Sequence, residues 1–167
     1  GSKTHAVKGK DKNAFGLYDM SGNVLEWVYD WKGNYQSGAQ TDPLGPNSGS
    51  YRVVRGGGWY GNAKNCRLAD RAGATPGDRY SGWGFRLART VPIEKCENGE
   101  CLVPKGSFTM GSPASELGRE SNETEHKVTI TRDFYMSQTE VTQGQWKAAG
   151  FANPSMFPSC GDDCPVE

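Results

Sequence analysis

Glycine and aromatic residues interrupt this sequence so often that few long aliphatic runs remain. The 167 residues include 23 glycines and, among the aromatic residues, 5 Trp, 7 Tyr and 6 Phe. An aromatic side chain buries a large area, and Trp and Tyr keep a polar edge, so such residues can anchor a core between short elements. The pattern therefore favours an irregular, turn-dominated fold over a helical bundle. A chain of this length is expected to form a single domain over residues 1–167.

The balance of charge argues against two classes of partner, nucleic acid and anionic membrane surfaces. The 19 Lys and Arg residues are matched by 19 Asp and Glu residues, so the formal net charge at pH 7 is zero. A protein that binds nucleic acid or an anionic membrane surface is expected to have a basic excess. No apolar run approaches the roughly 20 residues that a membrane-spanning helix needs. We therefore expect no nucleic acid and no membrane insertion, which leaves an unknown protein or small ligand as the partner.

Cys96 and Cys101 enclose a segment that is typical of a tight hairpin. The four residues between them read Glu-Asn-Gly-Glu, and Asn-Gly is a strong signal for a two-residue turn. With that turn, the two glutamates flank the loop and Cys96 faces Cys101 within reach of a disulfide. The sequence therefore predicts a Cys96–Cys101 disulfide.

A second cysteine pair, Cys160 and Cys164, closes another tight loop, and Cys66 is left over. The alternative is a zinc site from the four paired cysteines, but neither pair has the C-x2-C spacing that is usual in zinc knuckles. We therefore predict disulfides for both pairs. Because disulfides persist in oxidising compartments, the expected localisation is exported, either extracellular or periplasmic.

Short elements are predicted in both halves of the chain. Strand-like patterns occur at 51–55, 84–88, 127–130 and 134–136. Thr142 and Gln145 have the spacing of a capping box, which predicts a short helix that carries Trp146. The Ser- and Glu-rich segment 112–126 is interpreted as a solvated loop.

Three segments together resemble the formylglycine-generating-enzyme, or sulfatase-modifying factor, family. Residues 13–27 read NAFGLYDMSGNVLEW, and residues 52–59 read RVVRGGGW, followed by Cys66 and by GFR at 84–86. The third segment reads GSFTMGS at 106–112, with EVT at 140–142. The resemblance spans nearly the whole chain. It implies an α+β, C-type-lectin-like fold with little regular secondary structure.

The order of these segments differs from the family's order. Residues 5–90 resemble its C-terminal half, 91–103 are a connector, and 104–167 resemble its N-terminal half. The family's middle portion has no counterpart. The chain is therefore interpreted either as a circular permutant that has been trimmed, or as the end of one family domain joined to the start of the next. Because the termini of compact domains often lie close together, a permutant is plausible. Loss of core area on trimming also raises self-association as a possibility.

The oxidase activity of the family depends on a motif that this chain departs from. Catalytic members resemble R-G-G-S-x-x-C-x-x-x-x-C, in which two cysteines bind copper(I), and two soft thiolates suit that ion. On this pattern the first cysteine is Gly61, the second is Cys66 and the serine is Gly58, while a motif tryptophan is Leu25. We therefore expect no copper and no catalytic residue. A copper-dependent formylglycine-generating oxidoreductase, a sulfatase-activating cysteine oxidase that would use Cys66, is the alternative function.

Cys66 has simpler interpretations. A lone cysteine is usually a small buried hydrophobe, and a disulfide partner in the missing portion is the second possibility. Nucleophilic catalysis would need a nearby base, and the two histidines, His5 and His126, are not persuasive partners.

The resemblance also implies a calcium site in the segment 19–26. Carried over residue by residue, Asp19 and Glu26 would supply carboxylate oxygens, and Gly22 and Val24 would supply backbone carbonyls. Calcium prefers several hard oxygen ligands in flexible geometry. The structural alternative is an Asx-turn at Asp19 and a bond from Glu26 to a backbone amide. Calcium is therefore the expected cofactor.

The leading interpretation is a non-catalytic, calcium-stabilised module for binding a ligand or a protein, or for structure. In proteins that share the fold, the face after Arg-Gly-Gly is used for binding. That face would carry Trp59, Tyr60, Asn62, Lys64, Asn65, Asp78, Arg79, Tyr80 and Trp83. Exposed aromatic residues with adaptable polar neighbours suit recognition, although Trp59 and Trp83 can equally be core residues. Arg55, Arg67, Arg71 and Arg86 are expected to be structural, since arginine pairs well with carboxylates and carbonyls.

Overall fold

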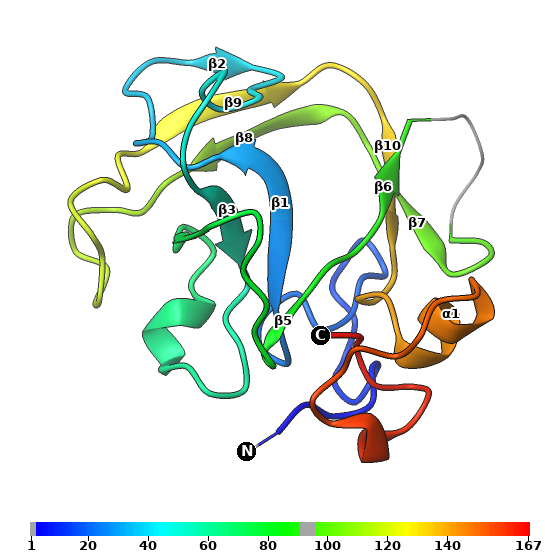
Figure 1. Ribbon diagram of the computed structural model, residues 1–167. Helices are drawn as coiled ribbons and strands as arrows, with labels where there is room; N and C mark the ends of the chain where they lie inside the picture. Colours follow the sequence, from blue (N-terminus) through cyan, green and yellow to red (C-terminus); the bar gives the residue numbers. More distant parts are fainter. Residues whose placement is uncertain (1–2, 91–95) are drawn as a thin grey trace.

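The computed structural model describes residues 3–90 and 96–167 (Figure 1). Its largest sheet has four strands in the order β4-β3-β1-β5. The central strand β1 (Leu25–Trp31) pairs antiparallel with β3 (Arg52–Arg55) and parallel with β5 (Trp83–Gly84), and β4 (Ala72–Ala74) pairs with β3. Val24, Val53 and Val54 are fully or almost fully buried against this sheet. Short β-branched runs between turns thus form the core.

Two three-stranded sheets join the two halves of the chain. In one, β10 (Phe134–Ser137) lies between β6 (Ala88–Arg89) and β7 (Glu100–Val103). In the other, β9 (His126–Ile130) lies between β2 (Gln40–Thr41) and β8 (Gly106–Met110). Each sheet therefore contains strands from residues before 90 and after 96. The strands predicted at 127–130 and 134–136 are confirmed.

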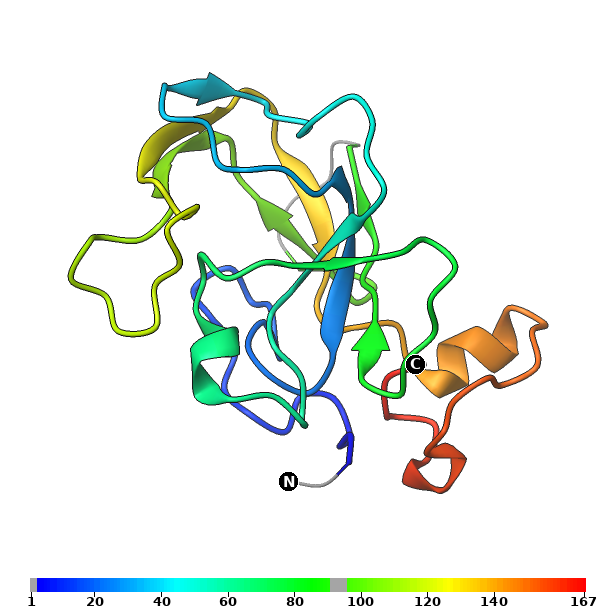
Figure 2. The ribbon, with the colours of Figure 1, turned by 60° about the vertical axis from the view of Figure 1, so that its left-hand side comes forward.

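Helical structure is limited to one short α-helix and two 3-10 turns among the described residues. The helix α1 (Gln143–Ala148) begins at Thr142, whose hydroxyl accepts the Gln145 N–H at 3.2 Å, while the Gln145 amide oxygen accepts the Thr142 N–H at 2.9 Å. This confirms the predicted capping box. The 3-10 turns are η1 (Ala63–Cys66) and η2 (Pro158–Cys160). Figures 1 and 2 show α1 and η2 together on one side, away from the β2-β9-β8 sheet.

The strand predicted at 84–88 is divided into two, which corrects the sequence interpretation. Residue 84 ends β5 and residue 88 begins β6, so the two ends of the segment belong to different sheets. Between them the backbone pairs with another segment, since Val141 N–H donates to Phe85 O and Ser137 N–H donates to Leu87 O, both at 2.8 Å. Arg86 therefore lies in a segment of the first half whose neighbouring residues are hydrogen-bonded to the second half.

Both predicted disulfides are present. Cys96 is bonded to Cys101, and Cys160 to Cys164. The Asn98-Gly99 turn is present as expected: both residues have positive φ, and the backbones of the flanking glutamates exchange two hydrogen bonds of 2.9 Å. The zinc alternative is wrong, since these four sulfurs are bonded in pairs. The first connector residues, 91–95, lie outside the described residues.

Candidate functional site

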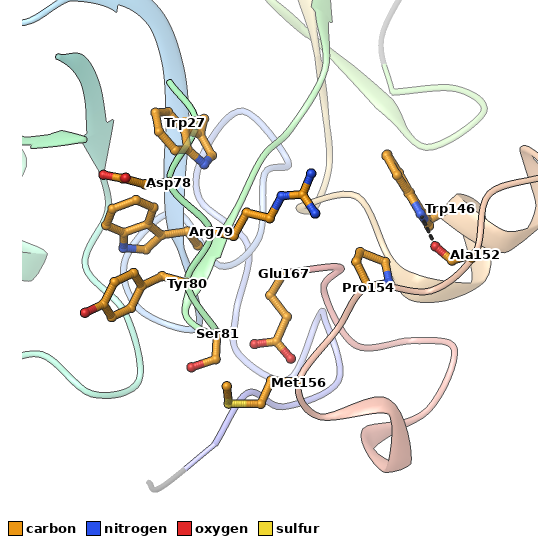
Figure 3. A pocket seen from close by; sticks show the side chains of 11 residues that line it. Trp27, Asp78, Arg79, Tyr80, Ser81, Trp146, Ala152, Pro154, Met156 and Glu167 are labelled. Carbon is orange, nitrogen blue, oxygen red and sulfur yellow. Dashed lines mark hydrogen bonds between the residues drawn. The ribbon is translucent and has the colours of Figure 1, made fainter. Parts of the chain in front are cut away.

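A pocket with a volume of about 440 Å³ opens between the loop before β5 and the segment after α1 (Figure 3). Its size is in the range of small-molecule binding sites. The lining residues come from both halves of the chain and are mostly aromatic or polar: Trp27, Asp78, Arg79, Tyr80, Ser81, Trp83, Trp146, Ala152, Pro154, Met156 and Glu167. The pocket therefore exists only when the two halves pack together.

Trp83 organises one wall of the pocket. Its ring is edge-on to Trp27 at 5.3 Å between ring centroids and is stacked on Tyr80 at 5.1 Å. Its indole N–H donates to the hydroxyl of Tyr60 at 2.8 Å. Aromatic pairs at these separations add to the stability given by burial. Tyr80 remains 62% exposed, so this wall is held in place and still accessible.

Trp146 forms the opposite wall. Its indole N–H donates to Ala152 O at 2.9 Å (Figure 3), and its ring packs on Phe151 at 4.7 Å and edge-on to Phe85 at 6.2 Å. These contacts fix Trp146 to the chain that follows α1. The predicted position of Trp146 on a short helix is confirmed.

The charged groups of the pocket differ in their environments. One carboxylate oxygen of Glu167 accepts the Phe157 N–H at 3.0 Å, while the other, Oε2, is buried without a partner among the described residues. Burial raises the pKa of Glu167. Figure 3 shows the Arg79 side chain reaching toward the space between Tyr80 and Trp146. The pocket thus offers aromatic surface together with groups of both charges.

The structure divides the binding face that the sequence predicted. Asp78, Arg79, Tyr80 and Trp83 line the pocket. Trp59 packs behind it, edge-on to Phe157, and its indole N–H donates to Ser81 O at 3.1 Å. Tyr60 is exposed and accepts the Trp83 indole N–H with its hydroxyl, and the other predicted residues, Asn62, Lys64 and Asn65, lie at or beside η1. Trp59 and Trp83 are both partly buried, which agrees with the core interpretation of these two residues better than with a free surface.

The sequence interpretation missed the far wall. Trp146, Met156 and Glu167 come from the last quarter of the chain, and nothing in their local pattern says that they face residues 78–83. Trp27 was also missed, although it ends the motif at residues 13–27. Alternation along β1 was the available signal there, since neighbouring strand residues point to opposite faces.

Cys66 lies beneath the Arg-Gly-Gly turn. A Cβ placed at Gly57 would be only 2.6 Å from the Cys66 Sγ, and Gly57 has φ +73, so glycine is required for both space and conformation. Cys66 is half-buried rather than fully buried. It is the free thiol of the chain, because the other four cysteines are in disulfides.

Gly61 and Gly58, which replace a cysteine and a serine of the oxidase motif, differ in how much space surrounds them. A Cβ at Gly61 would make ordinary contacts of 3.5 Å or more, whereas a Cβ at Gly58 would lie 3.1 Å from the Tyr60 ring. His126, considered as a base, uses its Nδ1 with Thr124 O at 2.9 Å, and its ring packs against Tyr35.

Three of the four residues expected to bind calcium, Asp19, Gly22 and Val24, lie in the turn before β1, and Glu26 is the second residue of β1. Asp19 is 8% exposed with φ +53, and its Oδ2 accepts the Lys8 N–H at 2.8 Å. Gly22 N–H donates to Gly56 O at 2.8 Å, and Val24 is fully buried. Within the described residues, no three His, Cys, Asp or Glu side chains are grouped so that they could hold a metal ion.

Glu26 has a partner that the sequence interpretation did not name. Arg86 donates from Nε and Nη2 to the Glu26 carboxylate at 2.5–3.0 Å. The same guanidinium donates to the carbonyls of Tyr18, Ser137 and Gln138 at 3.0–3.1 Å. Glu26 is thus held by a side chain and not by a backbone amide. The predicted structural role of Arg86 is confirmed.

A third carboxylate, Glu140, lies beside this pair. It is fully buried, and neither of its carboxylate oxygens has a hydrogen-bond partner among the described residues. The pKa of Glu140 is raised to about 8, mainly by burial; its own backbone N–H and the charge of Arg86 act to lower it, and the charges of Glu26 and Asp19 act to raise it. Glu140 belongs to the EVT segment that carried the family resemblance, but the charges that act on it come from residues more than 50 positions earlier in the chain.

Known proteins match in the same regions. The family described as Sulfatase-modifying factor enzyme 1-like domain matches residues 1–91 and 92–153. The chain is 45% identical over 94 residues to the serine/threonine-protein kinase pkn1 of Chlamydia caviae, which covers 54% of this chain and 15% of that protein. It is 38% identical over 95 residues to the formylglycine-generating enzyme of Streptomyces coelicolor, which covers 54% of this chain and 30% of the enzyme.

One solved structure is also similar. Treponema denticola variable protein 1 is 49% identical with a TM-score of 0.49, over 51% of this chain and 31% of that chain. The chain thus spans less than a third of the length of each of these relatives. The family match itself covers nearly all of the chain. This chain is a member of the sulfatase-modifying factor enzyme 1-like domain family.

Proposed function

We propose that this chain is a non-catalytic binding module of the family and that the pocket between Tyr80 and Trp146 is its ligand site. The observation that carries the proposal is the pocket itself, whose aromatic walls are fixed by Trp83 and Trp146. It also contains a buried carboxylate oxygen, Glu167 Oε2, that has no partner in the part of the chain that the structure describes. Apolar walls with a few oriented polar groups are typical of small-ligand sites.

The residues around the Arg-Gly-Gly turn favour a binding function over cysteine oxidation. Copper(I) bound by thiolates needs a second soft ligand near Cys66, and the aligned position is Gly61. The remaining four sulfurs are bonded to one another. The Cys66 thiol is also packed against Gly57. The chain's own cysteines therefore do not provide the two-thiolate site.

Calcium stabilisation is the second part of the proposal. Asp19 and Glu26 would supply carboxylate oxygens, and Gly22 and Val24 backbone carbonyls, which is the hard donor set that calcium prefers. A ligand that binds only the folded state stabilises it by about 2.7 kcal/mol at a hundredfold excess over its dissociation constant. Calcium should therefore raise the melting temperature of the chelator-treated protein, and Asp19→Ala should remove this rise. Identical melting curves in calcium and in chelator would contradict this part.

The architecture that we propose is a circularly permuted and trimmed C-type-lectin-like domain. The family matches in two blocks that meet at residues 91 and 92, at the start of the expected connector. The sheets β6-β10-β7 and β2-β9-β8 then restore contacts between the halves. We also propose that the protein is exported, since the two disulfides suit an oxidising compartment, and that trimmed surface allows self-association.

The binding proposal is tested with three probes of different chemistry: indole, benzoate and tetramethylammonium. Their binding is measured by ligand-observed NMR on the wild type, on Tyr80→Ala and on Tyr51→Ala. Tyr51 is a matched control because it is 54% exposed and does not line the pocket. We expect at least one probe to bind the wild type and Tyr51→Ala, and to bind Tyr80→Ala at least fivefold more weakly. No binding by any probe, or equal binding to Tyr80→Ala, would reject the pocket.

The non-catalytic part is tested with a Cys-x-Pro-x-Arg peptide. The copper-treated protein is incubated with the peptide in air, and the product is followed by mass spectrometry. We expect no aldehyde from the wild type. Time-dependent aldehyde that disappears in Cys66→Ala would restore the oxidase. Gly61→Cys is an informative variant, because a side chain fits at Gly61 without a close contact.

A further inference from the structure

Two groups of opposite charge, Arg79 and Glu167, line the pocket between Tyr80 and Trp146. No ion pair joins them in the part of the chain that the structure describes. Figure 3 shows the Arg79 side chain extending from the loop before β5 toward Trp146, with the Glu167 side chain below it in that view. The two charges therefore face the same space from the two halves of the chain.

The guanidinium of Arg79 has its donors available. An arginine carries five N–H donors and no acceptor. Arg79 is exposed, and its side chain has no hydrogen bond, ion pair or aromatic stacking partner among the described residues. In contrast, Arg67, Arg86 and Arg89 each donate to a carboxylate of the chain. Arg79 can therefore bind the carboxylate of a ligand through two parallel hydrogen bonds.

The carboxylate of Glu167 has the opposite requirement. One of its oxygens accepts the Phe157 N–H at 3.0 Å, and the other has no partner among the described residues. An ionised carboxylate can accept about four hydrogen bonds, so most of this capacity is unused. Burial also raises the pKa of Glu167, and a cationic group beside it would favour the ionised form. An ammonium group is a donor that suits this position.

Other polar groups of the pocket are already bonded within the protein. Asp78 Oδ2 accepts the Thr75 N–H at 3.0 Å, so this carboxylate closes its own turn. The indole N–H groups of Trp83 and Trp146 also have acceptors in the chain. The charged groups that remain are one guanidinium and one carboxylate, set between aromatic walls. A ligand that meets all of them carries a carboxylate, an ammonium and an aromatic ring.

We propose that the pocket binds a free aromatic α-amino acid in its zwitterionic form. Arg79 holds the ligand carboxylate, Glu167 holds the ligand ammonium, and the ring lies between the two aromatic walls. This inference rests on the proposed function of the pocket and names the chemical class of its ligand. Aromatic rings pack favourably on Trp and Tyr, and charge-assisted hydrogen bonds are stronger than neutral ones. The volume of about 440 Å³ suits a ligand of this size.

The inference is tested by ligand-observed NMR titration with four ligands that share a phenyl ring. L-phenylalanine carries both charges, phenethylamine only the ammonium and 3-phenylpropionate only the carboxylate. N-acetyl-L-phenylalaninamide carries neither charge and resembles a residue within a peptide. We expect L-phenylalanine to bind at least fivefold more tightly than either singly charged ligand, and the uncharged ligand to bind most weakly. Affinity for L-phenylalanine no higher than for the singly charged ligands would overturn the inference.

Two variants assign the charges. Glu167→Gln, whose amide oxygen can still accept the Phe157 N–H, should weaken binding of L-phenylalanine and phenethylamine at least fivefold and leave that of 3-phenylpropionate within twofold. Arg79→Gln should weaken binding of L-phenylalanine and 3-phenylpropionate at least fivefold and leave that of phenethylamine within twofold. Glu125→Gln and Arg132→Gln are exposed controls outside the pocket, and they should bind all four ligands as the wild type does.

The outcomes separate this inference from the proposed function. If neither these ligands nor indole, benzoate or tetramethylammonium bind the wild type, the pocket is rejected and both are wrong. If indole binds but the charges of L-phenylalanine add no affinity, or if neither variant discriminates between the singly charged ligands, only this inference is wrong. Tightest binding of N-acetyl-L-phenylalaninamide would indicate a peptide segment as the ligand and would also overturn it. Should a variant not fold, the four ligands on the wild type still decide.

Discussion

Arg67 and Arg86 each interact with three carboxylates, yet the pKa of one carboxylate is lowered beside Arg67 and that of another is raised beside Arg86. The Arg86 centre contains Asp19, Glu26 and Glu140, and the Arg67 centre contains Asp70, Glu116 and Glu123. In the Arg67 centre, two guanidinium nitrogens donate to the Glu123 carboxylate at 2.7 Å, and the Ser112 hydroxyl donates to it at 2.6 Å. These hydrogen bonds lower the pKa of Glu123 to about 2.

Glu123 and Glu140 are both almost inaccessible to solvent, with exposed fractions of 2% and 0%. The difference between them is the supply of donors. Glu123 receives charged and neutral donors from other residues, which stabilise its ionised form, whereas no other described residue donates to Glu140 and burial raises its pKa. Burial alone therefore does not determine the state of an acid in this fold. Each of the three carboxylates of the Arg67 centre forms an ion pair with Arg67, whereas in the Arg86 centre Glu140 has no hydrogen-bond partner among the described residues.

The largest effect is expected from Arg86→Met. This change leaves three buried carboxylates without their guanidinium and removes the bonds to three backbone carbonyls that join the halves. Removing one partner of a buried ion pair costs about 3–5 kcal/mol, and we expect the loss in unfolding free energy to lie at or above the upper end. Urea unfolding measures it. Arg86→Lys should recover only part of the loss, since lysine lacks the planar guanidinium that donates to both carboxylate oxygens at once. A loss below about 1 kcal/mol would show that the Arg86 centre does not stabilise the packing of the two halves.

Arg67→Met should cost less, about 3 kcal/mol. The Glu123 carboxylate loses its guanidinium but keeps the Ser112 hydroxyl, and Glu116 is partly exposed and can be solvated. The same urea experiment gives the comparison. The reverse order, with Arg67→Met more costly than Arg86→Met, would contradict the view that the Arg86 centre carries the larger uncompensated charge.

Acid should act on the Arg67 centre. The pKa of Glu123 in the folded protein is about 2 and its ordinary value is 4.5, so its contribution is complete above about pH 4.5 and is lost as the pH falls through about 2. The contribution is on the order of 3 kcal/mol. Unfolding free energies measured from pH 6 to pH 2 should fall more steeply in the wild type than in Glu123→Gln. Parallel curves would show that Glu123 is not selectively stabilised as a carboxylate.

The smallest effect is expected at an exposed pair of the same chemistry. Arg89 donates to Glu100 at 2.5–3.0 Å, but the two side chains are 40% and 21% exposed. Surface ion pairs contribute little because water competes for both charges. Arg89→Met should therefore shift the melting temperature by no more than about 1–2 °C. A shift as large as that of Arg67→Met would mean that burial does not separate these pairs.

Several local features could be predicted from the sequence because neighbouring residues produce them. The Asn98-Gly99 turn brought Cys96 and Cys101 together, and the Thr142–Gln145 box started α1. The segment 112–126 was interpreted as solvated, and most of it is exposed, but Glu123 is buried. Its partner Arg67 is 56 residues away, so no local pattern marked it.

The site shows the same limit. Four of the predicted face residues line the pocket, because they lie in β5 or in the loop just before it, next to the GFR motif at 84–86. Trp146 and Glu167 could not be assigned to it, since their approach depends on how residues after 140 pack against β5. Glu140 was part of a recognised motif, but its lack of donors follows from the complete use of Arg86 by other groups.

By itself, the sequence determined the family, the two disulfides, the short elements and the balance of charge, since each depends on residues close in the chain or on composition. Only the tertiary structure decided which arginine met which acid, where the aromatic walls converged and which carboxylate was left without a donor. The physical reason is that hydrogen-bond donors and solvent are shared among all groups at a buried site. The state of any one group therefore depends on partners that the chain brings from both halves.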